Sequence, residues 1–180
     1  MAKVFWDRED SEKIIKYWEK SRRHRRLLEF VAKLIPPGSV LDIPCGCGDL
    51  YPFVRNREYL GVDNSPWMLK WAKKKYPGIN VKYGDAYNLD ELGKYDNVVC
   101  ISLFLHLPDI EKPLVELWKH TKRHLIFTIH QGKPKRRIVG GFYIIIRSED
   151  EIKKHVQKIG PSEYRAVPFD KVEWVYVLSR

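Results

Sequence analysis

Residues 39–49 constrain the fold of this chain most, because a short apolar run there leads directly into a glycine-containing loop. The run closes on Asp42, and the loop carries Gly46 and Gly48. This pattern predicts a buried strand followed by a tight turn, where glycine lets a ligand come close to the backbone. We therefore expect a binding loop at the end of the first strand.

Two further predicted strands also end in a carboxylate. The apolar segment 59–63 closes on Asp63, and the segment 81–85 closes on Asp85. In folds that alternate strands and helices, ligands bind at the carboxyl ends of the strands. Three carboxylates at successive strand ends, beside one glycine loop, predict a nucleoside-binding edge.

The rest of the chain alternates between strand and helix patterns. Apolar residues recur at helical spacing over 11–35, with a break and N-cap expected at Ser21. Strands are expected at 39–43, 58–62, 79–83, 97–105, 124–130 and 142–146, with helices near 49–55, at 66–76, from 113 and at 148–159, and a closing hairpin of 163–169 and 172–178. This order predicts an α/β, Rossmann-like, doubly wound fold: a mostly parallel seven-stranded sheet with helices on both faces and a C-terminal antiparallel hairpin.

A length of 180 residues fits one domain. We expect residues 1–37 to form an N-terminal helical cap that belongs to the same domain as residues 38–180. No apolar run approaches the roughly 18 residues that a membrane-spanning helix needs, and the first residues show no signal-peptide pattern. We therefore expect a cytoplasmic protein without membrane contact.

The three cysteines do not form a metal-binding pattern. Cys45 and Cys47 are separated by one residue, whereas zinc sites usually show Cys-x-x-Cys spacing and two further ligands. Cys100 lies in an apolar run and is expected to be a small buried side chain. We expect no metal.

The formal net charge is +10, and the basic residues cluster, above all in 119–137, where no acidic residue occurs. Two interpretations stay open. One is the solvated surface of a thermophile-like protein rich in Lys, Arg and Glu. The other is attraction to a polyanion such as RNA.

The loop sequence excludes the commonest phosphate-binding motifs. A dinucleotide fingerprint would place a third glycine at position 51, where Tyr51 stands. A P-loop would follow Gly48 with lysine, but Asp49 stands there and would repel a phosphate. The residues found at these two motif positions favour a nucleoside cofactor that has no phosphate.

The ordered motifs resemble those of the class I S-adenosylmethionine-dependent methyltransferases, especially the small-molecule-type branch. The resemblance covers the chain from about residue 38 onward. Pro44 stands where the family has its first glycine. The four matching segments, in order, are Asp42 to Gly48, Gly61 to Leu69, Gly84 to Ala86, and Tyr95 to Asp109.

The resemblance implies roles for individual residues. Asp63 would accept hydrogen bonds from both ribose hydroxyls, which suits a carboxylate. Asp85 would bind the adenine amino group, and Asp42 would orient the loop and the ammonium group of the cofactor. The full set of expected cofactor-binding residues is Asp42, Pro44, Cys45, Gly46, Gly48, Asp63, Asn64, Met68, Asp85, Ala86 and Ser102.

Methyl transfer needs a general base only if the acceptor arrives protonated. His106 follows the fourth predicted strand and is the candidate base, while His130 and Gln131 follow the fifth and are candidate substrate contacts. Tyr17, in the helical cap, is a third candidate substrate contact. The segment 131–147 is short, and its residues 133–141 are basic. This predicts either an open site, covered mainly by the N-terminal helices, or a bulky anionic substrate.

Three functions are compatible with this sequence. The first is methyl transfer to a small or medium-sized acceptor, and the second is methylation of RNA held by the basic surface. The third is a non-catalytic adaptor that keeps the fold and the cofactor pocket. The sequence identifies neither the acceptor nor the oligomeric state.

Overall fold

The computed structural model describes residues 6–180. The helices are α1 (Arg8–Lys20), α2 (Arg22–Leu34), α3 (Tyr51–Val54), α4 (Pro66–Lys75), α5 (Glu111–Lys119) and α6 (Glu149–Ile159), with a short 3-10 turn η1 (Phe104–His106). The strands are β1 (Val40–Asp42), β2 (Tyr59–Asp63), β3 (Val81–Tyr83), β4 (Tyr95–Cys100), β5 (Thr121–His130), β6 (Lys135–Val139), β7 (Phe142–Ile146), β8 (Glu163–Pro168) and β9 (Glu173–Ser179).

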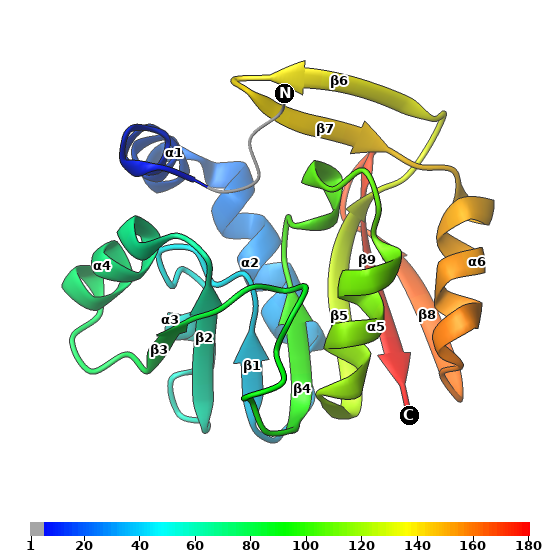
Figure 1. The fold of residues 1–180 in the computed structure, drawn as a ribbon, viewed down its shortest axis with the longest axis horizontal. Coiled ribbons are helices and arrows are strands. Elements are labelled where there is room, and N and C mark those ends of the chain that lie inside the picture. Colours follow the sequence, from blue (N-terminus) through cyan, green and yellow to red (C-terminus); the bar gives the residue numbers. More distant parts are fainter. Residues whose placement is uncertain (1–5) are drawn as a thin grey trace.

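Seven strands form one sheet in the order β3-β2-β1-β4-β5-β9-β8 (Figure 1). Strands β1 to β5 pair in parallel, whereas β9 runs antiparallel to both β5 and β8. The strand order reverses beside β1, where β2 and β4 flank it, and such a reversal opens a crevice at the carboxyl ends. The predicted fold class is confirmed.

Two apolar cores lie on opposite faces of the sheet. Helices α5 and α6 pack on one face, where Leu114 and Val156 join sheet residues such as Val98 in one buried cluster. Helix α2, with α3 and α4, packs on the other, where Val31 joins Val40 in a second buried cluster. This two-sided burial explains the apolar residues in the central parts of β1, β2, β4 and β5.

Serine side chains cap the N-termini of three helices. The Ser21 side chain accepts a hydrogen bond from the His24 N–H and separates α1 from α2, as predicted. Ser65 caps α4 and Ser148 caps α6 in the same way. The division at residue 37 stays a prediction. Within residues 6–180, no helix is long and apolar enough to cross a membrane.

The prediction of a strand over 97–105 was too long. Strand β4 ends at Cys100, Ser102 takes a left-handed conformation with φ 58°, and η1 follows. The apolar run continues because Ile101, Phe104 and Leu105 stay buried after the chain leaves the sheet. The apolar pattern that predicted a strand therefore continues past the end of β4, because these residues are buried without belonging to the sheet.

The segment after β5 also differs from its prediction. Residues 142–146 form a strand as expected, but β7 pairs with an unpredicted strand, β6, in a separate two-stranded sheet. Figure 1 shows this hairpin lying across the end of the main sheet, opposite the chain's C-terminus. The site is therefore covered by a hairpin as well as by the N-terminal helices. Strand β6 escaped prediction because every one of its residues is exposed.

Candidate functional site

The glycine loop is held by its neighbours on both sides of β1. The Ile43 N–H donates to the Val99 carbonyl at 2.9 Å, and the Cys45 N–H donates to the Val62 carbonyl at 2.9 Å. Gly46 has a φ of 52°, and its N–H donates to Asp63 Oδ2 at 2.8 Å. The loop backbone is thus fixed against the carboxylate that ends β2.

Gly48 allows the loop to pack against α4. Its φ is 80°, and a Cβ at this position would lie 2.7 Å from Ile79 Cδ1. We expect Gly48→Ala to lower the free energy of unfolding by about 2–3 kcal/mol, from backbone strain and overlap together. Urea denaturation measures the loss.

Gly78→Ala is the matched control for this variant. Gly78 has a similar φ of 86°, but no atom lies within 4 Å of its would-be Cβ. Gly78→Ala should lower the free energy of unfolding only through backbone strain, by about 1–2 kcal/mol. Equal losses in the two variants would show that close packing at Gly48 is unimportant.

Asp63 is the most completely engaged of the predicted carboxylates. Its side chain is buried, and besides the Gly46 N–H it accepts the Ser65 N–H at 2.9 Å. Burial raises its pKa to about 6, although both hydrogen bonds oppose that shift. The carboxylate retains further acceptor positions for a ligand, because its two oxygens offer about four lone pairs.

Asp42 lies deeper, at the end of β1. It is also buried, and Tyr59 donates its hydroxyl hydrogen to Asp42 Oδ2 at 2.8 Å. Burial raises the Asp42 pKa to about 7, with the charge of Asp63 adding to the effect and the Tyr59 hydrogen bond opposing it. Its position below the loop suits orientation of the loop.

Two adjoining hollows open at this edge of the sheet. The larger has a volume of about 500 Å³ and extends from Asp63 and Asp85 to the η1 turn and the β6–β7 hairpin. The smaller, about 80 Å³, lies between the glycine loop and helices α1 and α2. The predicted site residues that line one or both hollows are Asp42, Pro44, Cys45, Gly46, Asp63, Asn64, Met68, Asp85, Ala86, Ser102 and His106.

The remaining predicted residues lie elsewhere. Gly48 lines neither hollow, and Tyr17 projects into solvent with 62% of its surface exposed. Gln131 is buried and accepts the Tyr176 hydroxyl hydrogen at 2.6 Å, so its side chain ties β5 to β9. His130 also turns away from both hollows.

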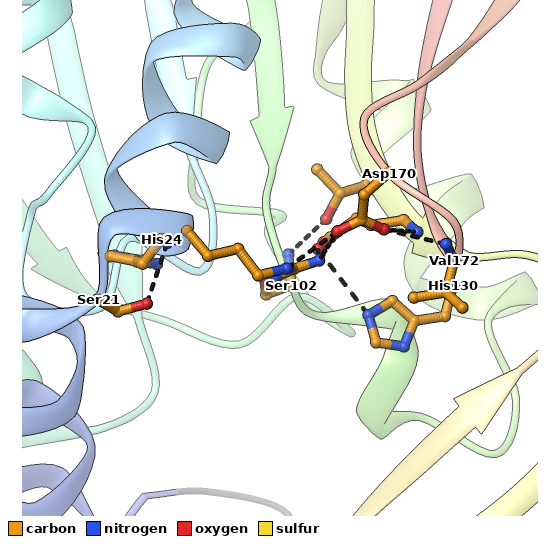
Figure 2. Close-up of polar contacts among 9 residues, drawn as sticks. Ser21, His24, Ser102, His130, Asp170 and Val172 are labelled. Carbon is orange, nitrogen blue, oxygen red and sulfur yellow. Dashed lines mark hydrogen bonds and ion pairs between the residues drawn. The ribbon is translucent and has the colours of Figure 1, made fainter.

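His130 belongs to a separate polar cluster between α2 and the β8–β9 turn. Its Nε2 lies 3.9 Å from Glu173 Oε2, which also accepts from Arg23 at 2.6 Å. Figure 2 shows Asp170 in the same cluster, and Asp170 accepts from Arg23 as well. These contacts connect helix α2 to the β8–β9 turn and the start of β9.

His106 stands at the boundary between the two hollows. Its Nδ1 lies 2.7 Å from the Tyr143 carbonyl oxygen, and because that oxygen only accepts, Nδ1 carries the hydrogen. In the neutral ring Nε2 therefore holds the lone pair. Burial lowers the His106 pKa below its ordinary value, which keeps the ring neutral near pH 7.

An aromatic wall built from two distant segments faces His106. The Trp6 and Phe142 rings stack with centroids 3.9 Å apart, and each lies edge-on to the His106 ring at 5.9 Å. Trp6 precedes α1 and Phe142 begins β7, so residues 136 positions apart in sequence build one surface. No local pattern signals such a pairing.

Arg147 was likewise missed, although it fixes the turn that carries His106. Its side chain is buried and donates to the carbonyl oxygens of Phe104 at 2.9 Å, Leu107, and Pro108 at 3.2 Å. Its Nε lies 2.9 Å from Glu151 Oε1. One guanidinium thus joins η1 to the end of the hairpin and the start of α6.

A second unpredicted cluster closes the smaller hollow. Asp49 Oδ2 lies 3.2 Å from His24 Nε2, and Asp49 Oδ1 accepts from Lys75 at 2.7 Å. These partners lower the Asp49 pKa well below its ordinary range, against the effect of burial. The Trp18 ring stacks on His24 with centroids 5.0 Å apart, above the glycine loop.

Within residues 6–180, no group of three or more His, Cys, Asp or Glu side chains is arranged to hold a metal ion. The three cysteines are free and buried. The polar side chains around the two hollows are carboxylates, two imidazoles, hydroxyls and one amide, a set suited to a polar organic ligand.

Comparison with known proteins agrees with this geometry. A family model described as a methyltransferase domain matches residues 40–124. A putative methyltransferase, 235L, of Invertebrate iridescent virus 6 is 35% identical over 65 residues, which cover 34% of this chain and 24% of that protein. Magnesium-protoporphyrin O-methyltransferase of Rhodobacter capsulatus is 29% identical over 113 residues, covering 58% and 49%. The matches thus span a quarter to a half of these curated relatives.

The solved structures include similar folds. The magnesium protoporphyrin IX methyltransferase of Synechocystis PCC 6803, crystallised with bound SAH, superposes with a TM-score of 0.70 at 20% sequence identity. The superposition covers 88% of this chain and 84% of that one. At this identity the likeness concerns the fold.

Proposed function

We propose that this chain, which matches a methyltransferase-domain family model over residues 40–124, is a class I S-adenosylmethionine-dependent methyltransferase. In this proposal it transfers a methyl group from S-adenosylmethionine to a small or medium-sized organic acceptor. The observation that carries the proposal is the convergence of Asp42, Asp63 and Asp85 on adjoining hollows beside the glycine loop. Convergent polar groups in a largely apolar hollow are the usual form of a small-molecule site.

The residues fit this cofactor without a metal or a phosphate-binding loop. Asp63 offers its remaining lone pairs to the two ribose hydroxyls, while Asn64 and Met68 flank the adenine position. Asp85 and the Ala86 N–H face the adenine edge. The loop 44–48 follows the methionine part, with Asp42 beneath it.

When bound, S-adenosylmethionine supplies a methyl carbon whose bond to sulfur breaks as the acceptor's lone pair forms the new bond. The chain's task is therefore mainly to position the acceptor in line with that bond and to exclude water. Trp6, Phe142 and the η1 turn form the wall that does this. His106 Nε2 takes the proton that a neutral acceptor loses.

This role for His106 makes a prediction. His106→Gln should leave S-adenosylmethionine affinity within about twofold and lower the rate of methyl transfer by about 10²–10⁴. In the unchanged protein, the rate should fall as acid protonates His106, below the ordinary histidine range because its pKa is lowered. A variant that kept the rate and its pH profile would exclude His106 as the base.

Two measurements test the proposed function. Calorimetry should detect S-adenosylmethionine binding to the full chain. Methyl-labelled cofactor incubated with metabolite, RNA and protein fractions of a cell extract should then label the metabolite fraction. Label confined to RNA would replace the proposed acceptor class, and binding without any transferred label would contradict catalysis.

A further inference from the structure

The β6–β7 hairpin carries an unusual group of cations. Residues 131–147 contain no acidic side chain, while Lys133, Lys135, Arg136 and Arg137 are all exposed. Among residues 6–180, no ion pair involves any of these four side chains. We call these four residues the basic arm.

Three other cations near the site have acidic partners. Arg23 pairs with Asp170 and Glu173, Lys75 pairs with Asp49, and Arg147 lies against Glu151. The basic arm, by contrast, places four positive charges without an acidic partner among the described residues on one hairpin and the residues before it. Such charge attracts anions over roughly a Debye length, about 8 Å at physiological salt.

The basic arm reaches the larger hollow through Tyr143. The Arg136 guanidinium carbon lies 4.0 Å from the centroid of the Tyr143 ring, and Tyr143 lines that hollow. The neighbouring walls are apolar or aromatic and come from Trp6, Phe142, Leu103, Leu107 and Pro108. Arg136 thus stacks on one wall residue of the hollow. The hollow also holds Asp63 and Asp85, and its apolar part, lined by the five residues just named, is the apolar chamber.

We infer that the methyl acceptor is a flat apolar molecule with a separate anionic substituent, whose ring occupies this chamber while the anion rests on the basic arm. The inference rests on the proposed function, because it names the acceptor class of the same site. An aromatic ring gains from stacking or edge contacts with Trp6 and Phe142. A carboxylate, sulfonate or phosphate gains from the arginines, which bind such groups in bidentate fashion.

A polyanion such as RNA would bind the basic arm in a different way. It would contact the exposed basic arm through its phosphates, and it would gain little from the enclosed apolar chamber. The apolar chamber therefore favours the small anion over RNA. RNA binding enters below as an outcome of the test.

The experiment compares two probes of similar shape, 2-naphthoate and 2-naphthylmethanol, by calorimetry with the full chain saturated with S-adenosylhomocysteine. The anionic probe should bind about tenfold more tightly than the neutral one, a difference of about 1.4 kcal/mol. In the double variant R136Q/R137Q that preference should fall to about twofold or less. The affinity for the neutral probe should not change.

The double variant K33Q/K73Q is the matched control, since Lys33 and Lys73 are exposed and lie away from both hollows. It removes the same charge and should keep the tenfold preference. Equal affinity for the two probes in the unchanged protein would overturn the inference, as would equal loss in both double variants.

Two further outcomes bear on the inference. If a twelve-nucleotide single-stranded RNA displaced 2-naphthoate at a lower concentration than other naphthalene carboxylates do, the result would overturn the inference in favour of RNA. Failure of S-adenosylhomocysteine itself to bind would contradict the proposed function, whereas a missing charge preference in the saturated protein contradicts only the acceptor class.

Discussion

Asp63→Ala should weaken S-adenosylmethionine binding by at least about 100-fold. The variant removes a carboxylate that would bind two ribose hydroxyls, each charge-assisted hydrogen bond contributing about 1.5–3 kcal/mol. It also frees the Gly46 N–H, so the glycine loop loses its tie to β2. Calorimetry of the variant and the unchanged protein measures the difference directly.

The Asp63→Asn variant removes the carboxylate charge but keeps nearly the same side-chain shape, and calorimetry measures its cofactor affinity as well. The Asp63 pKa is about 6, so below that pH the free protein must release a proton to present a carboxylate. Affinity should therefore fall as the pH drops through 6, and the variant should lose this dependence. Asp42 has a pKa of about 7 and is present in both proteins, and the loss of the Asp63 charge should lower that pKa in the variant. The dependence attributed to Asp63 is therefore the part near pH 6 that the variant lacks.

If Asp63→Ala bound the cofactor with unchanged affinity while remaining folded, the ribose site assigned to β2 would be wrong. Circular dichroism and a thermal melt of the variant establish whether it folds. A melt like that of the unchanged protein, together with lost binding, supports the assignment.

Arg147→Ala should cause the largest loss of stability among the single changes considered. The buried guanidinium donates to three carbonyl oxygens of residues 104–108, and the variant leaves these without donors while Glu151 loses its cation. Removing one member of such a buried charged network costs about 3–5 kcal/mol. Urea denaturation should show this decrease in the free energy of unfolding.

Arg165→Ala is the matched control, because Arg165 is exposed on β8. It should change stability by no more than about 0.5 kcal/mol. A loss of under about 1 kcal/mol in Arg147→Ala would show that the η1 turn holds its shape without the guanidinium.

The cofactor edge could be predicted because its determinants are local. Consecutive residues show the short apolar strand, the carboxylate at its end and the glycine loop. Parallel pairing of the strands then places Asp42, Asp63 and Asp85 at one edge of the sheet. The same locality explains why the Ser21 cap was predicted correctly.

The acceptor side could not be predicted in the same way. The Trp6–Phe142 stack and the three carbonyl contacts of Arg147 join segments far apart in sequence. Strand β6 shows neither alternation nor burial, so its basic residues gave no strand signal. Tyr17 was chosen for its aromatic ring, but the helix turns it to solvent and places Trp18 beside the loop instead.

The most direct test of the account is a crystal structure of the full chain soaked with S-adenosylmethionine. The account predicts density for the cofactor across the carboxyl ends of β1, β2 and β3, with the ribose hydroxyls on Asp63 and the methyl group directed toward His106. An empty edge at saturating cofactor, or the cofactor bound on another face of the sheet, would contradict it.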